Sequence, residues 1–139
     1  LHPAMPRECI PYFRCDKRLE ILDKNTRYRD LYADSKLIIT DYSSAVFDFA
    51  YLKKPVLYYQ QDVDEFFYGN HVYRKGYFDY EKDGFGEVEY TAEALVEQMI
   101  AYMENGCQLK DVYRKRIEET FPYCDKGNCR RVYEKIREM

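Results

Sequence analysis

The chain has little of several features that mark large classes of protein. It has no tryptophan, six glycines, five prolines, and no apolar run near the roughly 20 residues that a membrane-spanning helix needs. The low glycine and proline content excludes collagen-like and low-complexity chains. Basic residues (22) are fewer than acidic ones (25), so the net charge of −3 gives no overall positive field for nucleic acid. The composition, 46% hydrophobic and 34% charged, predicts one globular domain over residues 1–139.

Cysteine and histidine are too widely spaced for a metal site. The five cysteines include no CxxC pair, and neither of the two histidines lies near enough in sequence to complete a zinc site. We therefore expect no bound metal and no other cofactor, with free thiols in a reducing cytoplasm. The chain opens on Leu1-His2-Pro3 rather than on methionine, so we expect it to be part of a longer protein.

Aromatic residues are abundant, with 16 tyrosines and 8 phenylalanines. They favour a small core lined by rings over a platform on which nucleic-acid bases stack.

Apolar periodicity predicts alternating strands and helices, and hence a Rossmann-like parallel sheet flanked by helices. Residues 1–13, which contain three prolines, and the long segment 61–90 are expected to be mostly irregular. In the helix at 91–103 an apolar stripe is expected to face the core, as are Val132 and Ile136 in the last helix. The predicted strands are 18–22, 37–39 and 55–59, and the predicted helices are 25–33, 45–52, 63–68, 91–103, 109–121 and 128–138.

The segment 36–54 is the clearest functional signal in the sequence. A short apolar strand runs into a polar turn that contains Asp41, Ser43 and Ser44, and a helix follows. Such a turn presents N–H groups and a positive helix end to an anion, so it predicts a phosphate site. Asp48, four residues after Ser44, is placed to accept hydrogen bonds from the hydroxyls of a sugar or polyol. The alternative is that the serines only cap the helix and that Asp48 is solvated.

A second loop is expected beside this turn. In a parallel α/β sheet, ligands bind at the carboxyl ends of the strands. The turn after the strand at 37–39 and the segment 60–64 after the strand at 55–59 therefore share one edge. Gln60 and Asp62 are candidate contacts to the same ligand.

The sequence resembles the CDP-glycerol glycerophosphotransferases, which build the poly(glycerol phosphate) of teichoic acids. The resemblance covers nearly the whole chain, and the D-Y-S-S-x-x-x-D block is its most specific part. Near the end, Asp125-Lys126-Gly127 stands where the family has Asp-Gly-Lys, and residues 83–86 replace the family's Pro-Gly-Pro. The matching pieces, in order, are His2-Pro3, the block at 41–48, Lys54-Pro55, Asp62, residues 76–80 and residues 125–130.

The resemblance implies a glycosyltransferase of the B type, with two facing Rossmann-like domains, of which this chain is the C-terminal, donor-binding half. Residues 109–139 would form a C-terminal extension. The donor is CDP-glycerol, the acceptor is a polyol-phosphate polymer, and CMP is released. The full-length protein would lie at the inner face of a bacterial plasma membrane.

The resemblance also assigns roles to single residues. His2 would act catalytically at the phosphate, and the base that activates the acceptor would lie in the other half of the enzyme. The remaining residues would hold the donor: Ser43, Ser44 and Asp41 at the diphosphate, Asp48 at the glycerol or ribose, and Gln60, Asp62 and Asn128 as loop contacts.

Two other functions remain open. The same turn would serve a B-type glycosyltransferase that uses CDP-ribitol or a UDP- or GDP-sugar. A non-catalytic module is a different class, in which Phe66 and Phe67 dock a partner protein.

Overall fold

The computed structural model describes residues 6–13, 16–22, 25–69 and 74–139. The chain divides into two compact units, Leu1–Ser35 and Lys36–Met139. His2, the predicted catalytic residue, lies outside the described residues. A single domain over residues 1–139 stays a prediction.

The first unit begins with a 3-10 helix, η1 (Arg7–Tyr12), where the sequence predicted irregular chain. Pro6 precedes the helix and its carbonyl accepts the Cys9 N–H at 3.0 Å, while the Ile10 carbonyl accepts the Phe13 N–H at 3.1 Å. Prolines disfavour long α-helices, but a 3-10 segment is short, and here Pro6 stands before its first residue and Pro11 near its end. The prediction was therefore wrong for these six residues.

The predicted strand at 18–22 is also wrong. A carboxylate oxygen of Asp16 accepts the N–H groups of Arg18 at 2.7 Å and Leu19 at 3.1 Å, which bends the chain into a turn. An aspartate side chain that bonds N–H groups two and three residues later replaces the strand ladder locally. The helix α1 (Tyr28–Asp34) follows and begins after Arg27, not after Asn25 or Thr26.

The second unit contains a parallel three-stranded sheet, which confirms the predicted fold class. Its strands are β1 (Ile38–Thr40), β2 (Val56–Tyr59) and β3 (Gly86–Glu89), in the order β1-β2-β3. The expectation that 61–90 is mostly irregular missed β3. The Gly-Glu-Val-Glu sequence of β3 has low strand propensity, and pairing with β2 overrides it.

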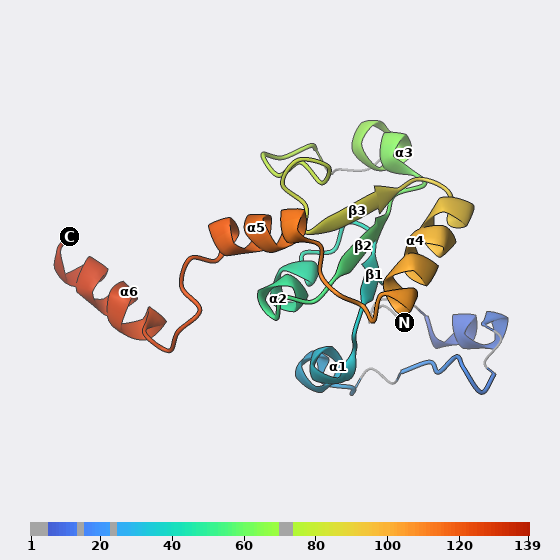
Figure 1. Ribbon diagram of the computed structural model, residues 1–139, viewed down its shortest axis with the longest axis horizontal. Helices are drawn as coiled ribbons and strands as arrows, with labels where there is room; N and C mark the ends of the chain where they lie inside the picture. The colour runs from blue at the N-terminus through green and yellow to red at the C-terminus, as the bar shows by residue number, and fades with distance from the viewer. Residues whose placement is uncertain (1–5, 14–15, 23–24, 70–73) are drawn as a thin grey trace. The chain divides into compact units, whose positions relative to one another are not determined.

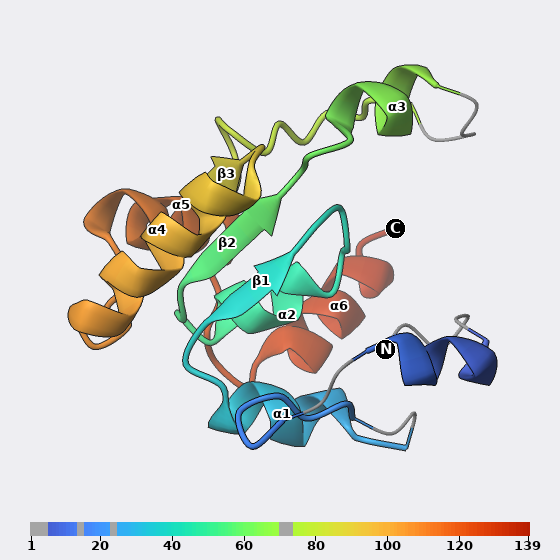
Figure 2. The same cartoon turned by 90° about the vertical axis from the view of Figure 1, so that its right-hand side faces the viewer.

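The central strand is covered on both faces. Val56, Leu57 and Tyr58 of β2 are fully buried. Figures 1 and 2 show α2 (Val46–Tyr51) and α4 (Ala92–Glu104) on opposite sides of the sheet, and both contact β2.

Three further helices complete the unit. The first, α3 (Val63–Tyr68), lies beyond the carboxyl end of β2 and matches the predicted range (Figure 2). The helix α5 (Asp111–Thr120) buries Ile117 and donates from the Arg116 side chain to the Gly84 carbonyl at 2.9 Å. The last is α6 (Asn128–Arg137).

The apolar stripe of α4 faces the core only in part. Leu95 and Met99 are half-buried as expected, but Met103 is 64% exposed. The buried anchor is instead Tyr102, whose hydroxyl donates to the Glu87 carboxylate on β3 at 3.0 Å. Val96 and Ile100 are also exposed. A large ring with a polar partner on the sheet therefore sets the rotation of the helix, which a count of apolar positions does not reveal.

The expectation that α6 turns Val132 and Ile136 inward was wrong. These side chains are 59% and 65% exposed, and α6 has no buried residue. Among the helices in the described ranges, none has the length and apolar character to cross a membrane.

Candidate functional site

The turn between β1 and α2 satisfies the N–H groups of the helix start from within the chain. The Ser43 hydroxyl accepts the Ala45 N–H at 3.3 Å. The Ser43 and Ser44 carbonyls accept the N–H groups of Val46 at 3.3 Å and Phe47 at 3.1 Å. The first turn of this six-residue helix therefore offers little to an anion.

The free donors lie one step earlier, in the turn itself. Within the described part of the chain, the backbone N–H groups of Ser43 and Ser44 and the Ser44 hydroxyl have no hydrogen-bond partner. Both serines are exposed. Two adjacent N–H groups and two hydroxyls are donors of the kind that hold phosphate oxygens.

These serines line a cavity of about 210 Å³, here called the serine cavity. The segment 76–80 folds over the turn and supplies the opposite side, so the polar donors sit among aromatic rings. The lining residues are Tyr42, Ser43, Ser44, Val46, Phe47, Gly76, Tyr77, Phe78 and Tyr80.

Tyr42 fixes the turn against α3. Its ring stacks on Phe66 with centroids 3.7 Å apart and planes 8° apart, and its hydroxyl donates to the Asp62 carboxylate at 3.0 Å. Burial and this bond to Asp62 raise the pKa of Tyr42 above its usual value, so the phenol keeps its proton. Tyr80 donates to the Tyr42 carbonyl at 3.2 Å. The sequence suggested Phe66 as a docking group for a partner protein. In the structure its ring packs on Tyr42 within the chain.

Gln60 lies at the carboxyl end of β2 and is only 2% exposed. Its backbone N–H donates to the Glu89 carbonyl at 2.9 Å, and its amide nitrogen lies 3.5 Å from the Asp41 carbonyl that accepts it. It lines a second cavity of about 220 Å³, here called the glutamine cavity. The other lining residues are Val63, Phe67, Tyr68, Lys75, Phe78, Asp79, Tyr80, Glu81 and Tyr90.

Two rings form a wall common to both cavities. Phe78 and Tyr80 line each of them and meet edge to face, with centroids 5.3 Å apart. Behind this wall lies Phe85, which is fully buried and contacts the rings of Phe47, Phe78 and Phe121.

The predicted site residues fall into two groups. Ser43 and Ser44 line the serine cavity and Gln60 lines the glutamine cavity, whereas Asp41, Asp48 and Asp62 line neither. Asp48 is exposed on α2, and the Asp41 carboxylate accepts the Tyr42 N–H at 2.6 Å. Sequence reasoning missed the aromatic walls of both cavities. Tyr42 lay inside the D-Y-S-S block, and the excess of tyrosine was the available signal for the rest.

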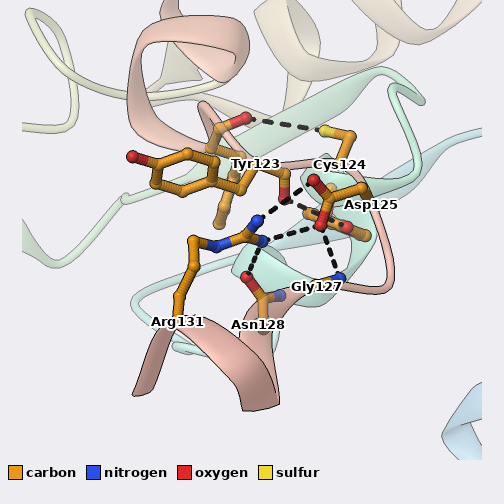
Figure 3. A network of polar contacts seen from close by, with 8 residues as sticks. Tyr123, Cys124, Asp125, Gly127, Asn128 and Arg131 are labelled. Carbon is orange, nitrogen blue, oxygen red and sulfur yellow. Dashed lines mark hydrogen bonds and ion pairs between the residues drawn. The ribbon is translucent and has the colours of Figure 1, made fainter. Parts of the chain in front are cut away.

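The segment between α5 and α6 is held by a polar network around Asp125 and Arg131 (Figure 3). The Arg131 guanidinium donates to both Asp125 carboxylate oxygens, at 2.7 and 3.1 Å, and the Gly127 N–H donates to the same side chain at 2.6 Å. Arg131 also donates to the Asn128 side chain and lies 4.1 Å from the Tyr123 ring centroid. The predicted donor contact Asn128 is thus engaged within the chain, and it lines neither cavity.

The Asp125 contact gives a pH-dependent prediction. The hydrogen bond from Arg131, followed by that from the Gly127 N–H, holds the pKa of Asp125 below its usual value of 3.8. Because the pKa of Asp125 is depressed in the folded chain, the contact contributes fully to the stability of the folded state above pH 3.8. This contribution is lost as the pH falls through the lower pKa of the folded chain. An NMR titration of the Asp125 carboxyl carbon should therefore have its midpoint below 3.8, with the Gly127 amide shifting in parallel.

In Arg131→Gln the midpoint should move upward, toward 3.8. Glu97→Gln, at an exposed position on α4, should leave it unchanged. A wild-type midpoint at or above 3.8 would contradict the contact.

Among the residues with described positions, no three His, Cys, Asp or Glu side chains are grouped so that they could hold one metal ion. The absence of a cofactor requirement stays a prediction of the sequence.

Known proteins with similar sequences identify the family of the chain. Residues 1–138 match the family described as CDP-Glycerol:Poly(glycerophosphate) glycerophosphotransferase. The chain is 40% identical over 138 residues to the minor teichoic acid biosynthesis protein GgaB of Bacillus subtilis (strain 168). The aligned region covers 99% of the chain and 15% of GgaB.

Two further relatives agree. The teichoic acid poly(glycerol phosphate) polymerase of Bacillus spizizenii is 37% identical over 78% of the chain and 26% of its own length. The teichoic acid glycerol-phosphate transferase of Staphylococcus aureus is 33% identical over 59% of the chain and 24% of its own length. The chain thus spans about a quarter or less of the length of these relatives, and no solved structure matches it significantly. Because the family match extends over residues 1–138, the chain belongs to the CDP-Glycerol:Poly(glycerophosphate) glycerophosphotransferase family.

Proposed function

We propose that this chain is the donor-binding part of a B-type glycerophosphotransferase that uses CDP-glycerol. The enzyme would transfer glycerol phosphate to a growing teichoic acid or related polymer and release CMP. Membership of the family supports this class of reaction. One observation supports the assignment of the donor site to this turn. Ser43 and Ser44, which have free hydrogen-bond donors, line a cavity at the carboxyl end of the sheet.

In this mechanism a hydroxyl at the polymer end attacks the β-phosphorus of CDP-glycerol. A new phosphorus–oxygen bond forms while the bond from that phosphorus to the bridging oxygen breaks, and CMP leaves. Ser43 and Ser44 donate hydrogen bonds to the diphosphate and stabilise the charge that spreads over its oxygens. His2 would assist at the phosphate, and the acceptor's proton would pass to a base outside these 139 residues.

The carboxylates have positioning roles in this proposal. Asp41 holds the turn, because its side chain accepts the Tyr42 N–H. Asp48 would orient the donor's glycerol or ribose hydroxyls, and Asp62 acts through its bond with Tyr42. The polymer acceptor, the second half of the enzyme and a location at the inner face of the plasma membrane belong to the same proposal, which includes no nucleic acid and no cofactor.

Calorimetric titration of the chain with CDP-glycerol tests the serine turn. Ser44→Ala is expected to weaken binding about tenfold, because one hydrogen bond to a charged phosphate is lost, and Asp48→Ala by a similar factor. Glu97→Ala, exposed on α4, serves as the matched control.

Unchanged affinity in both site variants would remove this site. Comparing CDP-glycerol with CDP-ribitol, UDP-sugars and GDP-sugars by thermal shift separates the glycerophosphotransferase from other enzymes that would use the same turn. Failure of every nucleotide to stabilise the chain would point to a non-catalytic module.

A further inference from the structure

The glutamine cavity is lined by a buried amide, that of Gln60, which the sequence predicts as a loop contact to the donor. Gln60 is 98% buried, and it is one of the residues that line the cavity. A buried amide costs free energy unless its donors and acceptor find partners. The partners of this amide are therefore informative.

Only the nitrogen of the amide is engaged. It donates to the Asp41 carbonyl, and this contact fixes the orientation of the group, because the reverse orientation would place two oxygens together. Among the described residues nothing donates to the amide oxygen of Gln60. Every fully buried polar side-chain atom in that part of the chain has a partner, so this oxygen is not fully buried, and Gln60 lines the cavity. The amide oxygen is therefore an unused hydrogen-bond acceptor of a residue that lines the cavity.

The other residues that line the cavity include both aromatic rings and polar groups. The Tyr90 hydroxyl donates to the Glu81 carboxylate at 2.7 Å, and the Lys75 ammonium lies 3.7 Å from the Asp79 carboxylate. The bond to Glu81, and then burial, raises the pKa of Tyr90 to about 12, so the phenol remains protonated at neutral pH. This combination of polar groups suits a ligand with hydroxyl groups, each of which donates one hydrogen bond and accepts two.

Size and charge narrow the ligand further. A volume of about 220 Å³ lies below the roughly 300–1,000 Å³ of pockets that enclose a drug-sized molecule, so it suits part of a ligand and not a whole nucleotide. The lining holds two carboxylates, Glu81 and Asp79, and one ammonium, Lys75, so its net negative charge disfavours a phosphate here. A phosphate is instead favoured on the other side of the Phe78–Tyr80 wall, where the free serine donors lie.

We infer that the glutamine cavity binds the hydroxyl groups of a glycerol phosphate unit whose phosphate lies at the serine turn. This inference rests on the proposed function. The unit comes either from the glycerol of the donor or from the terminal glycerol of the polymer acceptor, because both present the same hydroxyls beside a phosphate. Gln60 and Tyr90 are then residues that select for the polyol.

Three ligands measured on four chains test the inference. The ligands are CDP-glycerol, CDP and a short oligo(glycerol phosphate), and the chains are wild type, Gln60→Leu, Tyr90→Phe and the control Gln61→Leu. Gln61 is the exposed neighbour of Gln60 and lines neither cavity. Tyr90 is 44% exposed, so Tyr90→Phe keeps the test valid if Gln60→Leu fails to fold, which circular dichroism reveals.

If the donor's glycerol occupies the cavity, both site variants bind CDP-glycerol about tenfold more weakly and CDP as before. If the acceptor's glycerol occupies it, the loss of about tenfold appears with the oligomer, and both nucleotides bind normally. Wild-type affinity for CDP-glycerol and for the oligomer in the folded variants overturns the inference while leaving the serine turn in place. If the wild-type chain binds no nucleotide, the proposed function is refuted. In that case the inference is retained only if binding of the oligomer depends on Gln60. It is refuted if the oligomer does not bind.

Discussion

Gly86→Ala is expected to destabilise the unit Lys36–Met139 by more than about 3 kcal/mol, although it adds only one methyl group. Gly86 begins β3 and pairs with Val56 of the central strand. A Cβ at this position would lie 1.7 Å from the Val56 carbonyl oxygen, far inside contact distance. The obstacle is backbone in the middle of the sheet, so no side-chain rotation relieves it and the two strands must separate.

Denaturant unfolding followed by circular dichroism measures this loss. Gly76→Ala is the matched control, because nothing lies within 4 Å of the Cβ it would gain, and its stability should stay within about 0.5 kcal/mol of wild type. Equal stability of the two variants would mean that β3 does not pair with β2 in this register.

Phe85→Ala is expected to cost about 3–5 kcal/mol, as other large-to-small changes at buried aromatic positions do. Phe85 is fully buried, and its ring contacts Phe47 of α2, Phe78 before β3 and Phe121 after α5, with centroids 5.2, 5.8 and 5.9 Å away. Removing it leaves a hole where three segments meet. Because Phe47 and Phe78 also line the serine cavity, ligand binding there should weaken even when the variant is folded.

Tyr77→Ala provides the comparison, since Tyr77 is an aromatic residue of the same region but is 99% exposed. Its stability should change by less than about 0.5 kcal/mol. Phe85→Leu, which retains most of the buried apolar volume, should fall between the two. If Phe85→Ala is as stable as Tyr77→Ala, then Phe85 does not hold the three segments together.

The sequence predicted the fold where local pattern and tertiary packing agree. The apolar runs near β1 and β2 and the capped helix α4, where Thr91 accepts the Ala94 N–H at 3.3 Å, lie within a residue or two of their predicted positions. The sequence pattern did not predict β3, because a glycine followed by alternating glutamates is typical of a loop. The Glu87 carboxylate finds partners there in Tyr102 of α4 and in Lys110, the residue that precedes α5.

The site was predictable to a similar extent. Residue types alone marked the serine turn, since serines between a short apolar strand and a helix are typical of anion sites and helix caps. The cavity walls depend on the segment 76–80 folding over that turn, and no short-range pattern encodes such a contact. Gln60 was a candidate from its place after a strand, but its burial followed only from the structure.

The stack of Tyr42 on Phe66 has a thermodynamic consequence for ligand binding. Fixing the backbone of one residue costs about 1–2 kcal/mol of conformational entropy. Because the stack and the bond from Tyr42 to Asp62 hold the Ser43–Ser44 turn in the folded chain, that entropy is lost during folding and not when a ligand arrives. A substitution at Phe66 would therefore lower affinity by returning disorder to the turn, without removing a single atom that touches the ligand.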